Sequence, residues 1–469
     1  MIPAPLVALI YLVSAALFII GLKKLSSPAT ARRGNMLSGS GMLIAILVTL
    51  LDRAIISYGV IAAGLVVGTA VGYWMARSVQ MTSMPQMVAL LNGFGGAASL
   101  TVGGAEFLRA ELTGDVLSVD ASITIQIAVL IGAVTFTGSL VAFAKLQEIM
   151  TGRPILFAGQ KAVNILIFVA ILALSVYQVI TPDPVLWPFW AVVGLSLLIG
   201  VMLVIPIGGA DMPVVISLLN SYSGLAAAAT GFVINNHVLI IAGALVGSSG
   251  LILSQIMCRA MNRSLANVLF GAFGTAVVSS ARSSEGLTVK QLGVEDAAIQ
   301  LAYARLVIVI PGYGLAVAQA QHQVRELAEL IEKQGGEVRY AIHPVAGRMP
   351  GHMNVLLSEA NISYDKLITD VEEANDALPR ADIAIVVGAN DIVNPAALED
   401  PGSPIYGMPI IRSDTAQRTI VMKRSMASGF AGIENDLFFR DNTYMLFGDA
   451  KQTLNGLITE IKQELAVGV

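Results

Sequence analysis

The stretch LVIVIPGYGLAVA, residues 306–318, decides the fold of the C-terminal part of the chain. Leu306 to Ile310 is a β-branched apolar run, which predicts a buried strand. Gly312 and Gly314 follow at once, and one amphipathic helix is expected to continue to Gly335-Gly336. Strand, glycine turn and helix in this order favour a dinucleotide site, because the turn lets the backbone approach a pyrophosphate at the helix N-terminus. A purely structural glycine turn is the alternative.

Strand and helix patterns continue to alternate downstream of this unit. Further strands are predicted at Glu337 to Ile342, Ile383 to Val387, Thr419 to Met422 and Thr443 to Phe447, before a closing helix from Lys451 to Leu465. A sheet of about six strands is ordinary for a doubly wound domain. The sequence therefore predicts an α/β doubly wound, Rossmann-like domain.

The loops at the strand ends indicate which dinucleotide the domain prefers. No acidic residue ends the second strand, where the chain reads YAIHP from Tyr340 to Pro344, so the usual partner of the NAD ribose is missing and NADP is favoured. Lys423 and Arg424 follow another strand and together suit a 2′-phosphate. A solvated basic pair is the alternative for these two residues.

The N-terminal part has a different composition. The chain of 469 residues is 55% hydrophobic and 13% charged, and only 20 of its Asp, Glu, Lys and Arg residues lie in residues 1–264, against 40 in the remaining 205. This is more apolar than a soluble protein tolerates. The chain is therefore expected to lie partly in a lipid bilayer and partly in water.

Nine segments match a membrane span of about 20 mostly apolar residues. They are Pro3 to Leu22, Asn35 to Leu51, Ile56 to Ala76, Met84 to Phe107, Ala121 to Ala144, Ala162 to Ile180, Pro184 to Ile205, Met212 to Val233 and His237 to Met257. The first lacks a basic n-region and a cleavage site, so it is expected to be a retained span. An odd number places the two termini on opposite sides.

The loops between the spans predict the orientation, because cytoplasmic loops retain Lys and Arg. One set of loops carries Lys23, Lys24, Arg32, Arg33, Arg77, Lys145, Arg153, Lys161, Arg259 and Arg263, and the other carries only Arg53 and Arg109. For a bacterial inner membrane this puts the C-terminal domain in the cytoplasm and the N-terminus outside.

Small and polar residues within the spans predict where helices meet. Glycines at four-residue spacing, at 64, 68 and 72 and again at 243 and 247, favour close helix packing. Asp211 and Asn220 are expected on one helix, about two and a half turns apart, which suits a water-filled proton path. Helix-helix hydrogen bonding is the alternative.

The predicted organisation is a transmembrane domain at residues 1–262, a linker at 263–302 and the nucleotide-binding domain at 303–469.

Several kinds of site are not expected. The chain has no run of basic residues, so nucleic acid is not an expected partner. Cys258 is the single cysteine, so neither an intrachain disulfide nor a cysteine metal site is expected. No metal site and no covalent catalytic residue are predicted.

Several long stretches resemble the proton-translocating NAD(P) transhydrogenases. The C-terminal part is similar to their domain III, and the spans are similar to the β-subunit part of their membrane domain. The stretches are GGADMPVV (208–215), LNSYSG (219–224), GALVGSSG (243–250), PGYG (311–314), HPVAGRMPGHMN (343–354), GAND (388–391) and KRSM (423–426).

The resemblance implies an NADP(H) site in the C-terminal domain. Gly312 to Gly314 would form the pyrophosphate turn, Val345 to Pro350 would cover a nucleotide bound in reversed orientation, and Lys423 to Ser425 would hold the 2′-phosphate. The implied site residues are Gly312, Tyr313, Gly314, Ala316, Val317, Val345, Ala346, Gly347, Arg348, Met349, Pro350, Gly388, Ala389, Asn390, Asp391, Ile392, Gly407, Met408, Lys423, Arg424, Ser425, Met426, Ala427, Ser428, Gly429, Phe430, Asp449 and Ala450.

The resemblance also implies a proton path coupled to that site. Its residues would be Asn92, Asp211, Asn220, Ser248, Ser249, Gly250 and Arg263, with Asp391 in the loop that faces the membrane. Many members of the family have a histidine in place of Asn92, and an amide does not titrate near neutrality. The protonated group is then expected on a partner helix. Phe430 replaces a tyrosine that is frequent in the family.

These features predict half of a coupled enzyme. Hydride would pass directly between two nicotinamide rings, so the protein need only align the cofactors and exclude water. NAD(H) would bind to an alpha subunit that adds further membrane helices. The resemblance alone implies that two such protomers form a dimer. Coupling is expected in the Asp391 loop and in the linker from Arg259 to Ala302. A nucleotide-gated channel or a transporter with a regulatory domain is the alternative function.

Overall fold

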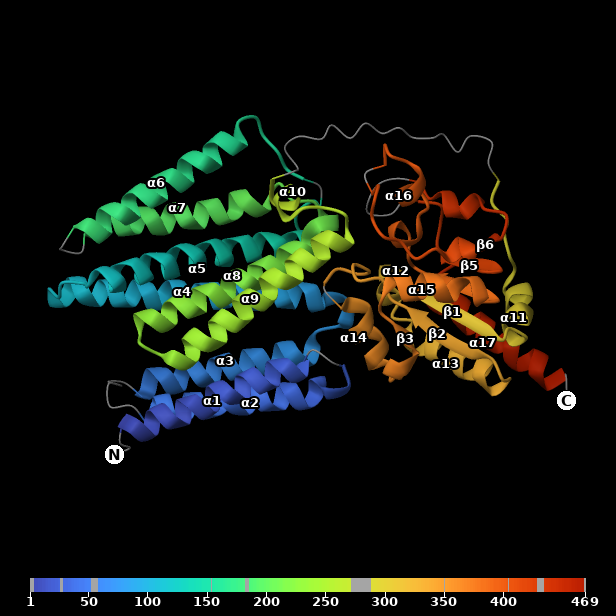
Figure 1. The fold of residues 1–469 in the computed structure, drawn as a ribbon, viewed down its shortest axis with the longest axis horizontal. Helices are drawn as coiled ribbons and strands as arrows, with labels where there is room; N and C mark the ends of the chain where they lie inside the picture. The colour runs from blue at the N-terminus through green and yellow to red at the C-terminus, as the bar shows by residue number, and fades with distance from the viewer. Residues whose placement is uncertain are drawn as a thin grey trace. The chain divides into compact units, whose positions relative to one another are not determined.

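The computed structural model describes residues 4–25, 28–51, 58–152, 154–181, 185–270, 288–349, 351–403, 405–427 and 434–467. The chain divides into two compact units. One comprises Met1–Gly208 and Val215–Ser254, and the other comprises Gly209–Val214 and Gln255–Val469. Figure 1 follows the chain through both.

The first unit is helical, and within the described residues it confirms the nine predicted spans, each long and apolar enough to cross a membrane. Most bounds differ from the predicted ones by a few residues. The helices are α1 (Ala4–Leu25), α2 (Pro28–Leu50), α3 (Tyr58–Ser78), α4 (Met84–Thr113), α5 (Val119–Leu146), α6 (Gln160–Ile180), α7 (Leu186–Val204), α8 (Met212–Val233) and α9 (His237–Ala260).

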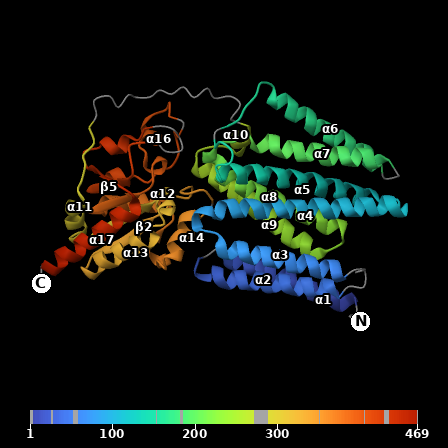
Figure 2. The same cartoon turned by 180° about the vertical axis from the view of Figure 1, so that it is seen from behind.

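Glycines bring several of these helices close together. Helices α1 and α2 lie side by side, as do α4 and α5 (Figures 1 and 2). A Cβ on Gly96 of α4 would stand 2.6 Å from the Gly132 oxygen of α5, and one on Gly243 would stand 2.5 Å from the Ala228 nitrogen. The predicted packing role of Gly243 is thus confirmed. Gly64, by contrast, has no described atom within 4 Å of such a Cβ, and the same holds for the other two glycines of its series in α3.

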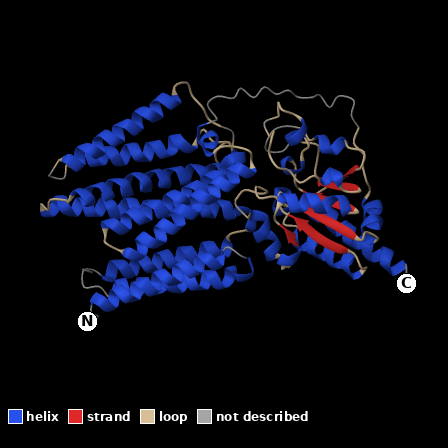
Figure 3. Ribbon diagram, viewed as in Figure 1, coloured by secondary structure: helices blue, strands red, loops and turns tan. Residues whose placement is uncertain are grey.

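The second unit holds all the strands among the described residues (Figure 3). They are β1 (Leu306–Pro311), β2 (Glu337–Ala341), β3 (Leu367–Ile368), β4 (Ile383–Val387), β5 (Arg418–Lys423) and β6 (Thr443–Phe447). All five pairings are parallel, in the order β3-β2-β1-β4-β5-β6. This is the strand order of a doubly wound dinucleotide-binding sheet, so the predicted fold class is confirmed.

The described residues also form further helices and 3-10 turns, all but η1 in the second unit. They are α10 (Leu265–Phe270), α11 (Val294–Ala302), α12 (Tyr313–Val317), α13 (Gln321–Lys333), α14 (His352–Glu359), α15 (Val371–Ala377), α16 (Ala396–Glu399) and α17 (Ala450–Val467), with 3-10 turns η1 (Met81–Ser83), η2 (Gly209–Asp211), η4 (Tyr364–Lys366), η5 (Leu378–Arg380), η6 (Asp391–Val393), η7 (Ser413–Thr415) and η8 (Asp436–Phe439). The prediction of a single helix after the glycine turn is wrong. It is divided into α12 and α13, because Gln319 between them takes a φ of +49°, which ends a right-handed helix.

Candidate functional site

The site begins where β1 and β4 lie side by side. Connections from β1 run toward β2 and β3, whereas those from β4 run toward β5 and β6. The strand order therefore reverses between β1 and β4, and in open α/β sheets ligands bind in the crevice outside the carboxyl ends of the strands at this point. The two loops that leave these ends are Gly312–Gly314 and Gly388–Asp391.

Glycines allow these two loops to cross. The Gly312 N–H donates to the Val387 oxygen, and the Gly314 N–H donates to the Gly388 oxygen, both at 2.9 Å. A Cβ on Gly312 would stand 2.4 Å from the Ala389 Cα, and one on Gly314 would stand 2.6 Å from the Gly388 Cα. Gly388 itself has a φ of +64°. The close contact between the two loops therefore requires glycines by itself, whether or not a ligand also approaches them.

Asn390 connects the β4 loop to the segment before η8. Its main-chain oxygen accepts a hydrogen bond from the Asn435 Nδ2 at 2.9 Å, and its own Nδ2 donates to the Asp391 Oδ1 at 3.1 Å. Asn394, which is fully buried, donates from Nδ2 to the Glu434 oxygen at 2.9 Å. These amides hold the loop after β4 in one conformation, so the Asp391 carboxylate has a defined position at the switch point.

Lys423 lies at the end of β5, the strand next to β4. Its Nζ donates to the Asn390 Oδ1 at 3.3 Å and lies 4.7 Å from the centre of the Phe438 ring. Burial lowers the pKa of this ammonium, and the nearby Asp391 carboxylate acts against that shift. Arg424 beside it is exposed. The structure therefore places one half-buried and one exposed cation at the carboxyl edge of the sheet.

The loop from Val345 to Met349, called the covering loop below, follows β2. The Arg348 guanidinium lies over the Tyr313 ring, with its carbon 4.4 Å from the ring centre. Tyr313 in turn meets His352 edge to face at 6.0 Å. The covering loop therefore contacts the glycine turn after β1, as a segment that covers a ligand at that turn would do.

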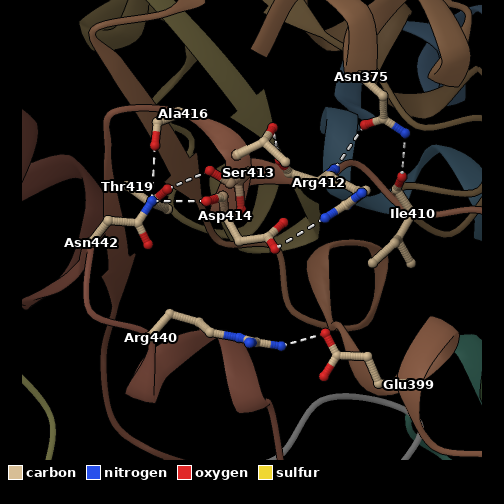
Figure 4. Close-up of polar contacts among 11 residues, drawn as sticks. Asn375, Glu399, Ile410, Arg412, Ser413, Asp414, Ala416, Thr419, Arg440 and Asn442 are labelled. Atoms are coloured by element: carbon tan, nitrogen blue, oxygen red, sulfur yellow. Dashed lines mark hydrogen bonds and ion pairs between the residues drawn. The ribbon is translucent and has the colours of Figure 1, made fainter. Parts of the chain in front are cut away.

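Polar side chains hold the chain from Ile410 to Ala416 in a defined conformation (Figure 4). Asn375 donates to the Ile410 oxygen at 2.9 Å and accepts from the Arg412 N–H at 2.8 Å. The Asn442 Nδ2 donates to the Asp414 and Ala416 oxygens, both at 2.8 Å. The segment just before, with Gly407 at a φ of +78° and the buried Met408, is thereby fixed at one end.

The remaining predicted nucleotide residues vary in exposure. Ala316 and Ile392 are buried, Val317 is exposed, and the Asp449 Oδ1 caps α17 by accepting the Lys451 N–H at 3.0 Å. Ala450 begins that helix. Ser425, Met426 and Ala427 are exposed after β5. Pro350, Ser428, Gly429 and Phe430 lie outside the described residues.

The residues predicted for the proton path make short helix-to-helix contacts. The Asn92 Nδ2 of α4 donates to the Ile216 oxygen of α8 at 3.2 Å, and Asn220 is partly buried in the same helix. A Cβ on Gly250 would stand 2.8 Å from the Ser221 nitrogen, so this glycine lets α9 approach α8. Helix-helix hydrogen bonding, the alternative to a proton path, is thus present here.

Two other predicted path residues bond within their own helix. The Ser248 hydroxyl donates to the Ala244 oxygen, and the Ser249 hydroxyl donates to the Val246 oxygen at 3.0 Å. Both serines are exposed on this chain. Their side chains are therefore not packed inside the described part of this helical unit.

Asp211 and Arg263 form an ion pair. The Arg263 Nη1 donates to both Asp211 carboxylate oxygens, at 2.9 and 3.2 Å. Asp211 belongs to the 3-10 turn η2 and not to α8. The prediction that Asp211 and Asn220 lie on one helix is therefore wrong. Pro213 explains the break, because proline is tolerated in the first turn of a helix and not within it. Burial raises the pKa of the Asp211 carboxyl, and Arg263 opposes this shift.

A cleft on the surface of the second unit lies elsewhere. It has a volume of 350 Å³ and is lined by His322, Arg325, Glu326, Glu329, Leu330, Lys333 and Lys462, from α13 and α17. Arg325 pairs with Glu329, and Lys462 pairs with Glu326. Four of the lining charges are thus matched in pairs. The strand order is the better guide to the position of a nucleotide site. Among the described residues no cluster of His, Cys, Asp and Glu suits a metal ion.

Comparison with known proteins identifies the family. The family model described as "NAD(P) transhydrogenase beta subunit" matches residues 7–460. Two Rhodospirillum rubrum sequences called "NAD(P) transhydrogenase subunit beta", one from a named strain, are each 48% identical to this chain over 454 residues. The match covers 96% of this chain and 97% of each relative. The chain belongs to the NAD(P) transhydrogenase beta subunit family.

Membership of this family establishes the general function of the chain. As a beta subunit of NAD(P) transhydrogenase, the chain is part of a multi-pass membrane oxidoreductase that couples hydride transfer between the nicotinamide nucleotides to proton translocation. An alpha subunit is its partner, and the enzyme uses NAD(H) and NADP(H). The predicted family and function are confirmed, and the channel or transporter alternative is not favoured.

The transhydrogenase structure also contains site residues that the sequence did not single out. His343 and His352 contact the covering loop, whereas Asn394 and Asn435 hold the loop after β4. Both histidines lie in the HPVAGRMPGHMN stretch on which the resemblance rests, so that stretch contained a signal. The asparagines act through buried side-chain bonds to distant main-chain oxygens, and no local pattern indicates such bonds.

Proposed function

We propose that this chain is the NADP(H)-binding subunit of the enzyme and that its alpha subunit binds NAD(H). The observation that supports this most directly is the switch point between β1 and β4, where Gly312–Gly314 meets Gly388–Asp391. A dinucleotide pyrophosphate would lie along these loops, beneath the covering loop. Glycine backbone at this place carries no side chains that would exclude a ligand from the crevice.

The charges at the strand ends suit a nucleotide with a 2′-phosphate. Lys423 and Arg424 bring two cations to the end of β5. The end of β2 offers no carboxylate, because Ala341 is followed by Ile342 and a buried His343. An acidic side chain there would repel a phosphate and favour NAD instead. The donor set therefore fits NADP(H).

The chain's own residues would bind and align the cofactor rather than react with it. When bound, the nicotinamide supplies or accepts the hydride. The crossed glycine loops and the amides of Asn390 and Asn435 would fix its position, and the covering loop would exclude water. No nucleophile is needed for a direct transfer between two aligned rings.

Proton conduction would involve the polar contacts of α4, α8 and α9. The Asp211–Arg263 pair would bind and release the proton, since burial already raises the pKa of the Asp211 carboxyl. Asn92 does not titrate, so the protonated group in mid-membrane would come from a partner helix. Asn220, Ser248, Ser249 and Gly250 would line the path. Coupling is reciprocal, since a proton that favours one conformation changes NADP(H) affinity as NADP(H) changes proton affinity.

We assign the coupling to the Asp391 loop and to the linker between Arg259 and Ala302. The membrane would be the bacterial inner membrane, with the C-terminal domain in the cytoplasm and the N-terminus outside, as the excess of Lys and Arg in one set of loops indicates. Two protomers, each with its alpha subunit, would form the working enzyme.

Titration of the purified complex with NADPH tests the assignment of the nucleotide. We expect Arg424→Ala to weaken NADPH binding by about ten-fold to a hundred-fold, the loss typical of a hydrogen bond to a charged group, and to leave NADH binding unchanged. Lys462→Ala is the matched control, because this lysine of α17 is paired with Glu326 of α13, away from the end of β5. Unchanged NADPH affinity in Arg424→Ala would refute a 2′-phosphate site at the end of β5.

A further inference from the structure

Two histidines lie at the two ends of the covering loop, and each accepts a hydrogen bond from its main chain. The Val345 N–H donates to the His343 Nδ1 at 3.3 Å. The Arg348 N–H donates to the His352 Nδ1 at 3.0 Å. Both bonds use the same ring atom as an acceptor, and an imidazole nitrogen accepts only when it carries no proton.

His343 anchors the beginning of the covering loop to a part of the chain that is itself held in place. Its Nε2 lies 2.7 Å from the Pro409 oxygen, and since a carbonyl only accepts, Nε2 must donate. Pro409 directly precedes the segment from Ile410 to Ala416, which the Asn375 and Asn442 amides fix (Figure 4). The ring is buried, at 1% exposure. The neutral tautomer with its proton on Nε2 satisfies both contacts.

His352 anchors the other end of the same loop to the glycine turn after β1. It is fully buried and begins α14. Its ring packs edge to face on Tyr313, which also lies beneath the Arg348 guanidinium. Gly347 has a φ of +107°, and a Cβ there would stand 2.5 Å from the His352 Cβ. The covering loop therefore bends around this imidazole.

We propose that His343 and His352 are positioning residues that hold the covering loop closed over the bound nucleotide and thereby set the rate at which the nucleotide leaves. The proposal rests on the proposed function, because the loop covers a ligand only if NADP(H) binds at the switch point. Opening the loop breaks the two main-chain bonds to Nδ1. Neither histidine needs to touch the nucleotide for this role.

The chemistry of the His352 contact allows a matched pair of substitutions. In asparagine the Oδ1 stands near the place of the imidazole Nδ1, so His352→Asn keeps an acceptor for the Arg348 N–H. In glutamine the amide stands near the place of Nε2, so His352→Gln removes that acceptor while it keeps a polar side chain of similar size. His343 allows no such matched pair. Asparagine there keeps the acceptor for the Val345 N–H and loses the donor to the Pro409 oxygen, whereas glutamine keeps the donor and loses the acceptor.

The experiment measures the dissociation rate of NADPH from the purified alpha-beta complex, after dilution into excess NADP. We expect His352→Gln to release NADPH about five-fold faster, as the loss of one ordinary hydrogen bond implies, and His352→Asn to stay within two-fold of the wild type. Either amide at position 343 loses one of the two bonds of that histidine, so both His343→Gln and His343→Asn should release NADPH about five-fold faster. The melting temperature of the nucleotide-free complex is measured for the same variants. A purely structural role would lower this temperature without making the NADPH release rates of the asparagine and glutamine variants differ.

Two results separate the proposals from each other. Equal release rates for His352→Asn and His352→Gln, or wild-type release rates for both His343 variants, would overturn the role of the histidines. With tight NADPH binding by the wild type, either result would leave the proposed function intact. Failure of the wild-type complex to bind NADPH, whatever the variants do, would overturn the proposed function itself.

Discussion

Acidification should destabilise the C-terminal domain through His343. Burial lowers the pKa of this imidazole to about 4, against the hydrogen bond to the Pro409 oxygen, which raises it. In the unfolded chain the pKa is about 6.5. Between these values the unfolded state binds one proton more than the folded state, so stability is complete above pH 6.5 and is lost as the pH falls toward 4.

The magnitude follows from the two pKa values. At pH 5 the difference costs about 2 kcal/mol of unfolding free energy, which corresponds to about a thirty-fold change in the unfolding equilibrium. Hydrogen exchange of the β1 and β4 main-chain amides in the full complex measures it, after correction for the intrinsic pH dependence of exchange. We expect protection to fall by about that factor from pH 7 to pH 5.

Two variants make this test specific. His343→Gln keeps a donor to Pro409 but does not titrate, so its protection should change less with pH than that of the wild type. His322→Gln, at an exposed histidine of α13, should behave like the wild type. If His343→Gln lost protection on acidification as steeply as the wild type, the buried imidazole would not be the cause.

The remaining predictions concern glycines at backbone contacts. Gly314→Ala should destabilise the C-terminal domain by about 2 kcal/mol or more, because its Cβ would stand 2.6 Å from the Gly388 Cα; urea unfolding followed by circular dichroism measures this, and unchanged stability would contradict it. Gly250→Ala should impair proton-coupled turnover, because its Cβ would stand 2.8 Å from the Ser221 nitrogen of α8. Gly64→Ala is its control, with no described atom within 4 Å, and equal activity losses in both variants would show that helix contact is not the reason.

Most of the architecture could be predicted from local patterns. The strand at Ile383 to Val387 has the predicted bounds, because its five buried apolar residues lie between a charged Asp382 and a glycine, Gly388, that both favour a strand end. The membrane spans could be predicted for a similar reason, since a segment of about 20 apolar residues is typical of a membrane-spanning helix. The short strand Leu367–Ile368 was not identified, because two residues carry no periodicity.

The site could be predicted only in part. Gly312, Gly388 and Lys423 lie at the carboxyl ends of neighbouring strands, as the alternation of strands and helices implied. The break at Gln319 and the turn at Asp211 differ from the expected helices, because both depend on a few backbone dihedrals that tertiary contacts decide. The roles of His343 and Asn435 depend on main-chain oxygens far away in the sequence, which no window of local sequence contains.

The most direct test of the central claim is hydride transfer from NADPH to an NAD analogue in membranes that contain this chain, with and without the alpha subunit, before and after addition of an uncoupler. The account predicts transfer that requires the alpha subunit and changes its rate when the uncoupler collapses the proton gradient. Tight NADPH binding without transfer, in the presence of a verified alpha subunit, would contradict it.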